Sequence, residues 1–418
     1  LRFVRAIFYF DLKIHHKHIP WIDETMTQEE ILATTNRDLS DQALWDKIAD
    51  DFRFAANNLP VVQDDVGRAS ALSAKAYLAK TLLYQAYEQD ELHNVININQ
   101  GKLEEVVSLV DDIEASDVYA LFDDYAKNFL SDFENGTESV FAIQRSLNDG
   151  SPDGRGSWSS ALNAPMSGGF GCCGFHVPTE NFVNAFKTDT NGLPRFSTYN
   201  DSVYNVNNDT VDPRLDHTVA MEGKPFKYDP DLIHGGDSWA RAPAIYGNYT
   251  AMKDLEHPDC DCRGENGPFP IFSLNTVLIR YAEVLLWKAE ALIELDRWDE
   301  ALPIINRLRE RAANSTGRLN NASLYRIADY TSFADKDEAR QALRWERRLE
   351  LGLEGHRFFD LVRWGIAKET IDSYLTTERG RKPYLEDASF TRNKHEYLPI
   401  PNQQINLSGG IYVQNPGY

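Results

Sequence analysis

The sequence is poor in positive charge, in cysteine and in long apolar runs, and each shortage narrows the possible functions. Its 43 Lys and Arg are outnumbered by 64 Asp and Glu, which gives a net charge of −21. Because binding to a phosphate backbone needs clustered cations, this balance argues against a nucleic-acid ligand and more weakly against any polyanion. No stretch is apolar over the length needed to span a bilayer.

The four cysteines form two close pairs, Cys172-Cys173 and Cys260-Asp261-Cys262. Neither spacing is the CxxC knuckle of a zinc site, so the cysteines do not indicate a metal. Adjacent cysteines rarely bridge to each other. The alternatives that stay open are free thiols, or a disulfide that joins one pair to the other across the fold in an oxidising compartment.

Helical periodicity dominates both ends of the chain. Apolar residues at spacings of three and four predict helices over 2–14, 41–59, 67–89 and 102–114. Residues 275–312 predict an αα-hairpin, with an apolar stripe that begins at Leu278 and with Asp299 as the cap of the second helix. The run AEALIELDRWDEAL within it resembles a tetratricopeptide unit. Such a hairpin cannot bury its own face, so we expect others to pack beside it.

Residues 337–366 predict further helix and carry charges of both signs at high density. One interpretation makes the carboxylates a catalytic acid and base. The other is a network of ion pairs that joins helices, and the excess of arginine favours it because guanidinium groups hold carboxylates ionised. The residues concerned are Arg347, Arg348, Glu350, Glu354, Arg357, Asp360 and Arg363.

From about residue 131 to 270 the periodicity fades, and Gly, Pro, Asn and Ser become frequent. One short helix is predicted here, over 179–187. Loops of this length in a compact protein are usually functional or disordered. The scattered aromatic residues would be unusual in a disordered segment, so we interpret this region as functional.

Several segments, taken in order, resemble the SusD/RagB family. The specific ones lie near the C-terminus: WERRLELGLEGHRFFDLVRWG (345–365), EYLPIPNQQI (396–405) and QNPGY (414–418). The run RYAEVLLWKAEAL (280–292) is similar to the long helix that precedes those motifs in the family. Weaker similarity to earlier parts of the family lies in LRFVRAIFYFDL with HIPWID (1–23), FHVPTENFVNAF (175–186) and DPRLDHTV (212–219).

This resemblance implies a mainly all-α fold, in which tetratricopeptide-like helical hairpins form a scaffold and a large loop-rich subregion binds ligand. We expect one SusD-like unit in three parts: N-terminal hairpins over 1–130, the loop-rich region over 131–270, and the C-terminal hairpin with the family motifs over 271–418. The chain opens in a helical pattern without a signal peptide or a lipidated cysteine. We therefore expect that the family's N-terminal start is absent from it.

The resemblance also implies a function. Members of the family are non-catalytic lipoproteins, anchored by an N-terminal lipid on the outer face of the outer membrane of Bacteroidetes. They bind oligosaccharide or polysaccharide, without a cofactor, and deliver it to a SusC-like TonB-dependent transporter. The alternatives are a RagB-like protein that takes up peptides, a scaffold whose partner is the transporter alone, and a glycosidase, for which no pair of carboxylates is singled out.

A neutral glycan offers hydroxyls at its edge and an apolar face, so its site needs flat aromatic rings and a few polar groups. Trp158 and Trp239, each in a loop among Ser, Asp and Gly, are the predicted stacking platforms, and Phe170 is a third. Weaker candidates for hydroxyl contacts are Asp153, Arg155 and Asn163. Carboxylates at Asp259, Asp261 and Glu265 suit a structural Ca²⁺, although their spacing is not that of an EF-hand.

Overall fold

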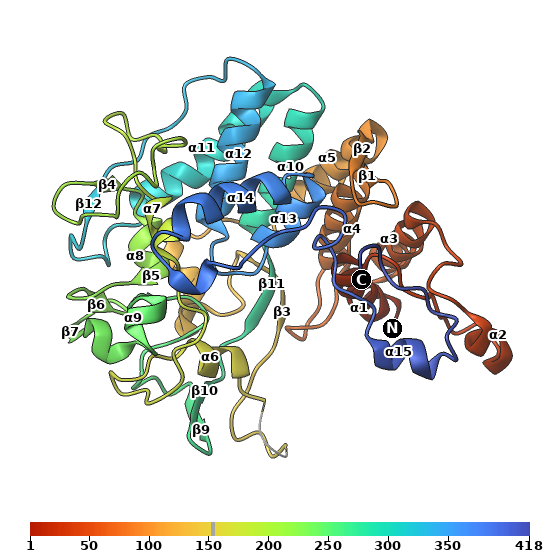
Figure 1. Ribbon diagram of the computed structural model, residues 1–418, viewed down its shortest axis with the longest axis horizontal. Coiled ribbons are helices and arrows are strands. Elements are labelled where there is room, and N and C mark those ends of the chain that lie inside the picture. Colours follow the sequence, from red (N-terminus) through yellow and green to blue (C-terminus); the bar gives the residue numbers. More distant parts are fainter. Residues whose placement is uncertain (152–154) are drawn as a thin grey trace.

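The computed structural model describes residues 1–151 and 155–418, and it is mainly helical (Figure 1). The first helices lie at one end of the molecule, the C-terminal hairpin lies beside them, and a large region of loops and short elements occupies the opposite end. None of the helices in the described residues is both long and apolar enough to cross a membrane. The mainly α-helical scaffold with a loop-rich subregion confirms the predicted fold class.

The N-terminal helices occur where the periodicity predicts them. They are α1 (Arg2–His16), α3 (Asp41–Asn58), α4 (Ala71–Ala86) and α5 (Gln100–Ala115), with the short α2 (Gln28–Ala33) in a connection. Ser40, Ser70 and Asn99 cap α3, α4 and α5 by accepting backbone N–H groups. Helix α4 is buried along nearly its whole length because α3, α5 and α10 pack around it. It ends before residue 89, since β1 (Tyr87–Gln89) turns back to pair with β2 (Val95–Ile98).

The predicted hairpin is also present, as α10 (Tyr281–Glu294) and α11 (Trp298–Asn314). Two details of the prediction are wrong. Leu278 is not helical, because the β-branched run at 276–280 forms β11 (Thr276–Arg280), antiparallel to β3 (Ser139–Ile143). Asp299 is not the cap of α11: the helix begins one residue earlier, and Asp299 lies in its first turn. The helices that follow are α12 (Lys336–Glu350), α13 (Arg357–Arg363) and α14 (Ala367–Glu378).

The loop-rich region holds short helices and two-stranded sheets around cores of its own. Its helices are α6 (Trp158–Asn163), α7 (Glu180–Asn184), α8 (Arg214–Thr218) and α9 (Pro243–Tyr246). Its strand pairs are β5 (Val219–Ala220) with β8 (Thr250–Ala251), β6 (Pro225–Phe226) with β7 (Asp229–Ile233), β9 (Arg263–Asn266) with β10 (Phe269–Phe272), and β4 (Thr210–Val211) with β12 (Leu324–Tyr325). The predicted helix 179–187 is realised as the shorter α7, capped by Thr179.

A buried network of ion pairs joins this region to the helices. Glu350 of α12 contacts Arg280 and Arg214 at 3.0 Å and Arg311 at 2.6 Å. Burial would raise the pKa of Glu350, but the arginines outweigh burial and hold it well below its usual range. Near it, Lys253 and Arg280 hold Glu354. The structural interpretation of these two carboxylates is thus confirmed, whereas Arg348 and Arg357 form no ion pair with the described residues.

The C-terminal segment, with α15 (Asn402–Leu407), packs back on the start of the chain. The backbone N–H of Leu398 donates to His15 O at 2.7 Å, and Asn415 Nδ2 donates to His16 O at 2.9 Å. These contacts cover the end of α1 and the residues that follow it, where His18 is 3% exposed.

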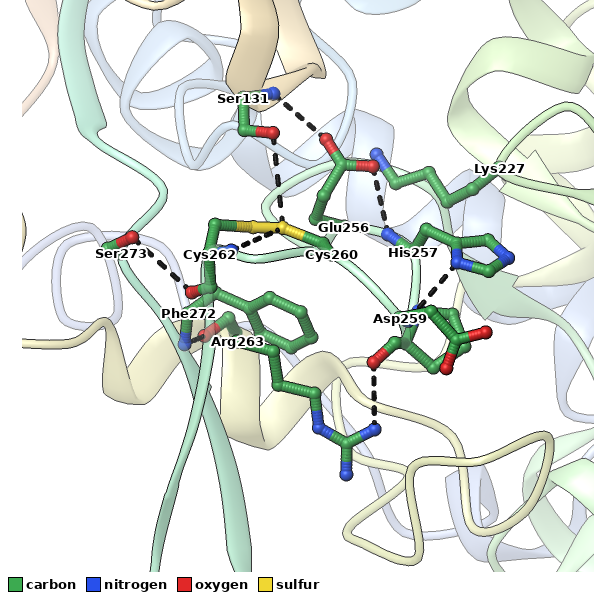
Figure 2. The surroundings of a disulfide bond; sticks show 12 residues. Ser131, Lys227, Glu256, His257, Asp259, Cys260, Cys262, Arg263, Phe272 and Ser273 are labelled. Carbon is green, nitrogen blue, oxygen red and sulfur yellow. Dashed lines mark hydrogen bonds between the residues drawn. A yellow bond between two sulfur atoms is a disulfide. The ribbon is translucent and has the colours of Figure 1, made fainter. Parts of the chain in front are cut away.

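Both cysteine pairs bridge within themselves, as Cys172–Cys173 and Cys260–Cys262. Neither alternative that the sequence leaves open, free thiols or a bridge from one pair to the other, is therefore found. Figure 2 shows the second bridge, in the turn before β9. Cys262 N donates to Cys260 Sγ at 2.9 Å, and the neighbouring Glu256 accepts from Ser131 N at 2.9 Å.

Candidate functional site

The three predicted aromatic platforms differ in exposure. Trp158, the first residue of α6, is 51% exposed and touches Phe269 edge-on at 5.9 Å between ring centroids. About half of its side chain is therefore open to solvent. Trp239 and Phe170 are 5% and 4% exposed, and both pack on Phe226. The prediction that these two rings stack on a ligand is wrong, because they form a hydrophobic core of the loop-rich region.

The predicted polar contacts are scattered. Arg155 is exposed and pairs with Asp149 at 2.9 Å. Asn163 is buried, and its Oδ1 lies 2.8 Å from Nδ1 of His176. Asp153 lies outside the described residues. Of the two described positions, Arg155 is thus engaged by an acidic side chain and Asn163 by a histidine.

The three acidic residues proposed for Ca²⁺ do not converge. Asp259, Asp261 and Glu265 are exposed, and Glu265 accepts from Arg263 Nη2 at 2.6 Å. Asp261 lies between the two bridged cysteines in the sequence, and Asp259 directly precedes the first of them. Within residues 1–151 and 155–418, no group of three His, Cys, Asp or Glu side chains is placed to hold a metal ion. The calcium hypothesis has no support from this geometry.

A cleft of about 480 Å³ is walled by aromatic rings that the sequence does not single out. We call it the aromatic cleft. Three loops build it: the segment 174–180 after the Cys172–Cys173 bridge, the turn and helix α9 at 241–246, and the end of α14 with the 3₁₀ turn Pro383–Leu385. Phe175 and Tyr246 are each 44% exposed, and Tyr384 is 47% exposed. Figure 1 shows α9 beside the chain that follows α14.

The first two loops are held together by Arg241. Its Nε donates to Cys173 O at 2.7 Å, and its guanidinium lies 4.4 Å from the ring centroid of Phe175. Gly174 makes this close approach possible. It has a φ of +67°, and a Cβ there would lie 2.9 Å from the Arg241 Cβ. The segment between the bridge and Phe175 is thus fixed against α9.

The third loop brings tyrosines. The rings of Tyr246 and Tyr384 lie 5.4 Å apart and are inclined by 58°, so together they form an angled wall. Tyr374 on α14 also lines the cleft, and burial, together with nearby Tyr384 and Glu378, raises its pKa to about 12. It therefore remains a neutral phenol at neutral pH, able to donate and accept hydrogen bonds.

Two further hollows adjoin the aromatic cleft. The inner cavity, of about 560 Å³, shares His176 and Val177 with it. The cations of the inner cavity are paired and lie over its rings: Lys253 contacts Glu354 and is 4.6 Å from the Phe129 centroid. The other hollow, of about 730 Å³, shares Thr179 and Tyr374 with the aromatic cleft and is lined by Arg347, Arg348 and Arg357. We call it the arginine hollow.

Helical hairpins that carry a loop-built cleft define the class of this protein, and part of the chain matches the model of a known family. Residues 271–418 match the model of the SusD family. A SusD-like protein of Formosa agariphila is 25% identical over 98% of this chain and 70% of its own length. The structure of a SusD-like protein from Bacteroides fragilis, 20% identical, covers 100% of this chain and 78% of that one with a TM-score of 0.72.

A laminarin-binding SusD-like protein of known structure is 24% identical, with a TM-score of 0.63 over 100% of this chain and 77% of that one. Residues 271–418 thus match the SusD family, as the C-terminal motifs predict, and the rest of the chain shares the fold of SusD-like structures.

Proposed function

We propose that this protein binds an oligosaccharide or polysaccharide in the aromatic cleft without cleaving it. The observation that carries the proposal is the group of half-exposed rings, Phe175, Tyr246 and Tyr384, around a hollow of about 480 Å³. Aromatic faces suit the apolar face of a sugar, and a hollow of this size is typical of ligand sites. Two proteins with the same fold add support: one is a laminarin-binding SusD-like protein, and the structure of another contains a xylogluco-oligosaccharide.

Binding without catalysis fits the carboxylates that line the cleft. Glu180 and Glu378 both contact Arg381, at 3.2 and 3.1 Å. Glycoside hydrolysis needs one carboxyl group as acid and another as base or nucleophile. Two carboxylates held by the same guanidinium do not provide that division of roles. We therefore favour capture over hydrolysis.

By family resemblance, the captured glycan passes to a SusC-like TonB-dependent transporter, with this protein on the outer face of the outer membrane. We also propose that the protein consists of three parts, residues 1–130, 131–270 and 271–418. The aromatic cleft draws residues from the second and third parts, so the two would act as one binding unit. Trp158, exposed on α6, is proposed as an outer platform for a longer chain.

Calorimetric titration with a panel of polysaccharides tests the binding proposal. Tyr246→Ala and Tyr384→Ala should each weaken binding by about fivefold or more, since a ring contact is worth on the order of 1 kcal/mol. Phe8→Ala is the matched control, because Phe8 is 64% exposed on α1, away from the cleft. Unchanged affinity in both tyrosine variants would refute the site. Binding of peptides in place of glycans would favour the RagB-like alternative.

Two further measurements test the rest of the proposal. New reducing ends after incubation with a bound glycan would show hydrolysis and contradict capture. Co-purification with a TonB-dependent transporter from outer membranes would support delivery, and recovery without any such partner would count against it.

A further inference from the structure

We propose that the glycan is acidic, and that Arg241 and Lys382 bind its carboxylate or sulfate groups beside the aromatic rings. This inference rests on the proposed glycan function and adds the substrate class. It starts from two cations that line the aromatic cleft without an acidic partner. Among the described residues, no carboxylate forms an ion pair with Arg241 or Lys382.

These two cations line the same cleft as two acidic side chains, yet in the described residues they form no ion pair with them. Asp and Glu outnumber Lys and Arg by 64 to 43, so most cations could find a carboxylate. The two carboxylates that line the same cleft, Glu180 and Glu378, are instead engaged by Arg381, and Glu378 also accepts from Asn200 Nδ2 at 3.0 Å. The cleft therefore keeps positive charge that its own acids do not neutralise.

The geometry of Arg241 suits an anionic sugar. Its Nε is engaged by Cys173 O, which fixes the plane of the guanidinium, while Nη1 and Nη2 make no hydrogen bond to the described residues. That leaves two donors side by side, the arrangement that binds a carboxylate or sulfate in a bidentate manner. The same guanidinium lies over Phe175. A sugar that stacks on an exposed ring of the cleft would thus present its substituent close to the charge.

The positive charge continues into the arginine hollow. Arg348 donates to Asn181 Oδ1 at 2.6 Å and lies 5.1 Å from the Tyr199 ring centroid, but it has no carboxylate partner in the described chain. Arg357 likewise has no carboxylate partner in the described chain. Burial, together with the nearby Arg348, lowers the pKa of Arg357 to about 9. The acids of this hollow already have partners: Asp360 pairs with Arg347 of the same hollow and with Arg363, and Glu369 pairs with Arg392.

The two hollows share Thr179 and Tyr374, so rings and unpaired cations follow one another along a continuous surface. Arg347 adds a buried Nη1 without a hydrogen-bond partner. A single small anion would need only one of these cations. A chain of acidic sugars, with a charge on successive units, would contact the cations of both hollows.

The test compares each acidic polymer with its own neutralised form. The probes are oligogalacturonate with its carboxyl-reduced derivative, and a sulfated galactan with its desulfated derivative, titrated at low and at physiological salt. We expect one acidic member to bind at least tenfold more tightly than its neutral counterpart, and the difference to shrink as salt rises. Lys382→Gln should lower that affinity about tenfold and leave the neutral form unaffected. Arg241→Gln should lower the affinity for the acidic form more than the affinity for the neutral form, because it removes the charge and also a contact that holds Phe175.

Lys47→Gln is the matched control, since Lys47 is an exposed residue of α3 and its replacement removes the same charge far from the cleft. Lys382 anchors neither neighbouring loop by its side chain, so Lys382→Gln keeps the test valid if Arg241→Gln disturbs the fold. Equal binding of acidic and neutral forms, sensitive to Tyr246→Ala but not to the two cation variants, would overturn this inference and leave the proposed function intact. Absence of binding to every glycan would overturn both.

Discussion

Replacing Glu350 with Gln should destabilise the whole protein, because this carboxylate lies where the loop-rich region meets the helices. Its side chain is fully buried and contacts Arg214, Arg280 and Arg311 at 2.6–3.0 Å. Gln keeps the shape but removes the charge, so the arginines lose a shared partner in a place that water cannot reach. Removal of one member of a buried ion pair typically costs about 3–5 kcal/mol.

The lower part of that range is expected here. Arg214 keeps Asp212 and Glu346, whereas Arg280 and Arg311 keep Glu138. Each cation therefore retains some compensation, and we expect a loss of about 3 kcal/mol in the free energy of unfolding. Urea unfolding followed by circular dichroism measures it, with Glu310→Gln on the exposed face of α11 as the matched control. A loss below about 1 kcal/mol would refute the view that this network holds the two regions together.

Three further predictions follow from single contacts. Gly174→Ala should lower the free energy of unfolding by about 1–3 kcal/mol and weaken glycan binding, because the new Cβ would meet Arg241. Gly171 is also at positive φ but has open space around it, so Gly171→Ala should leave binding unchanged. Trp239→Ala should cost about 3–5 kcal/mol of unfolding free energy, whereas Trp158→Ala should cost less than about 1, so equal losses would contradict their assigned burial. Burial opposes ionisation of Glu354, but Arg280 and Lys253 lower its pKa to about 2. The contribution of Glu354 to stability is therefore present above pH ~4.5 and lost as the pH falls toward 2. An unfolding free energy that stays constant over that pH window would count against this contribution.

The helical scaffold is predictable because its signals are local. Spacings of three and four locate α1, α3, α4 and α5, and residues such as Ser70 mark where a helix begins. The errors occur where a distant segment decides the outcome. Leu278 fits the helical stripe of α10 by spacing alone, yet it lies within β11, a strand that pairs with β3 more than a hundred residues earlier in the chain. Periodicity within one segment does not contain that information.

Most residues of the candidate site could not be predicted from the sequence. Phe175, Tyr246 and Tyr384 come from three separate loops, and no spacing relates them. Trp158 and Trp239 have the same local setting of small and polar neighbours, yet one is half-exposed and the other forms a core. Composition indicates which region holds aromatic residues. Which of them face solvent depends on how the loops fold over one another.

The net charge of −21, like the composition, describes the whole chain and does not predict the charge of the candidate site. Taken over the whole chain, it argues against an acidic ligand. At physiological ionic strength, however, the Debye length is about 8 Å, so exposed acidic groups farther away are largely screened. A ligand in the aromatic cleft responds mainly to the groups that line it, where Arg381 holds both carboxylates and Arg241 and Lys382 stay unpaired. Distant acidic surface would then reduce non-specific binding of polyanions elsewhere, and the unpaired cations of the aromatic cleft would favour an acidic glycan there.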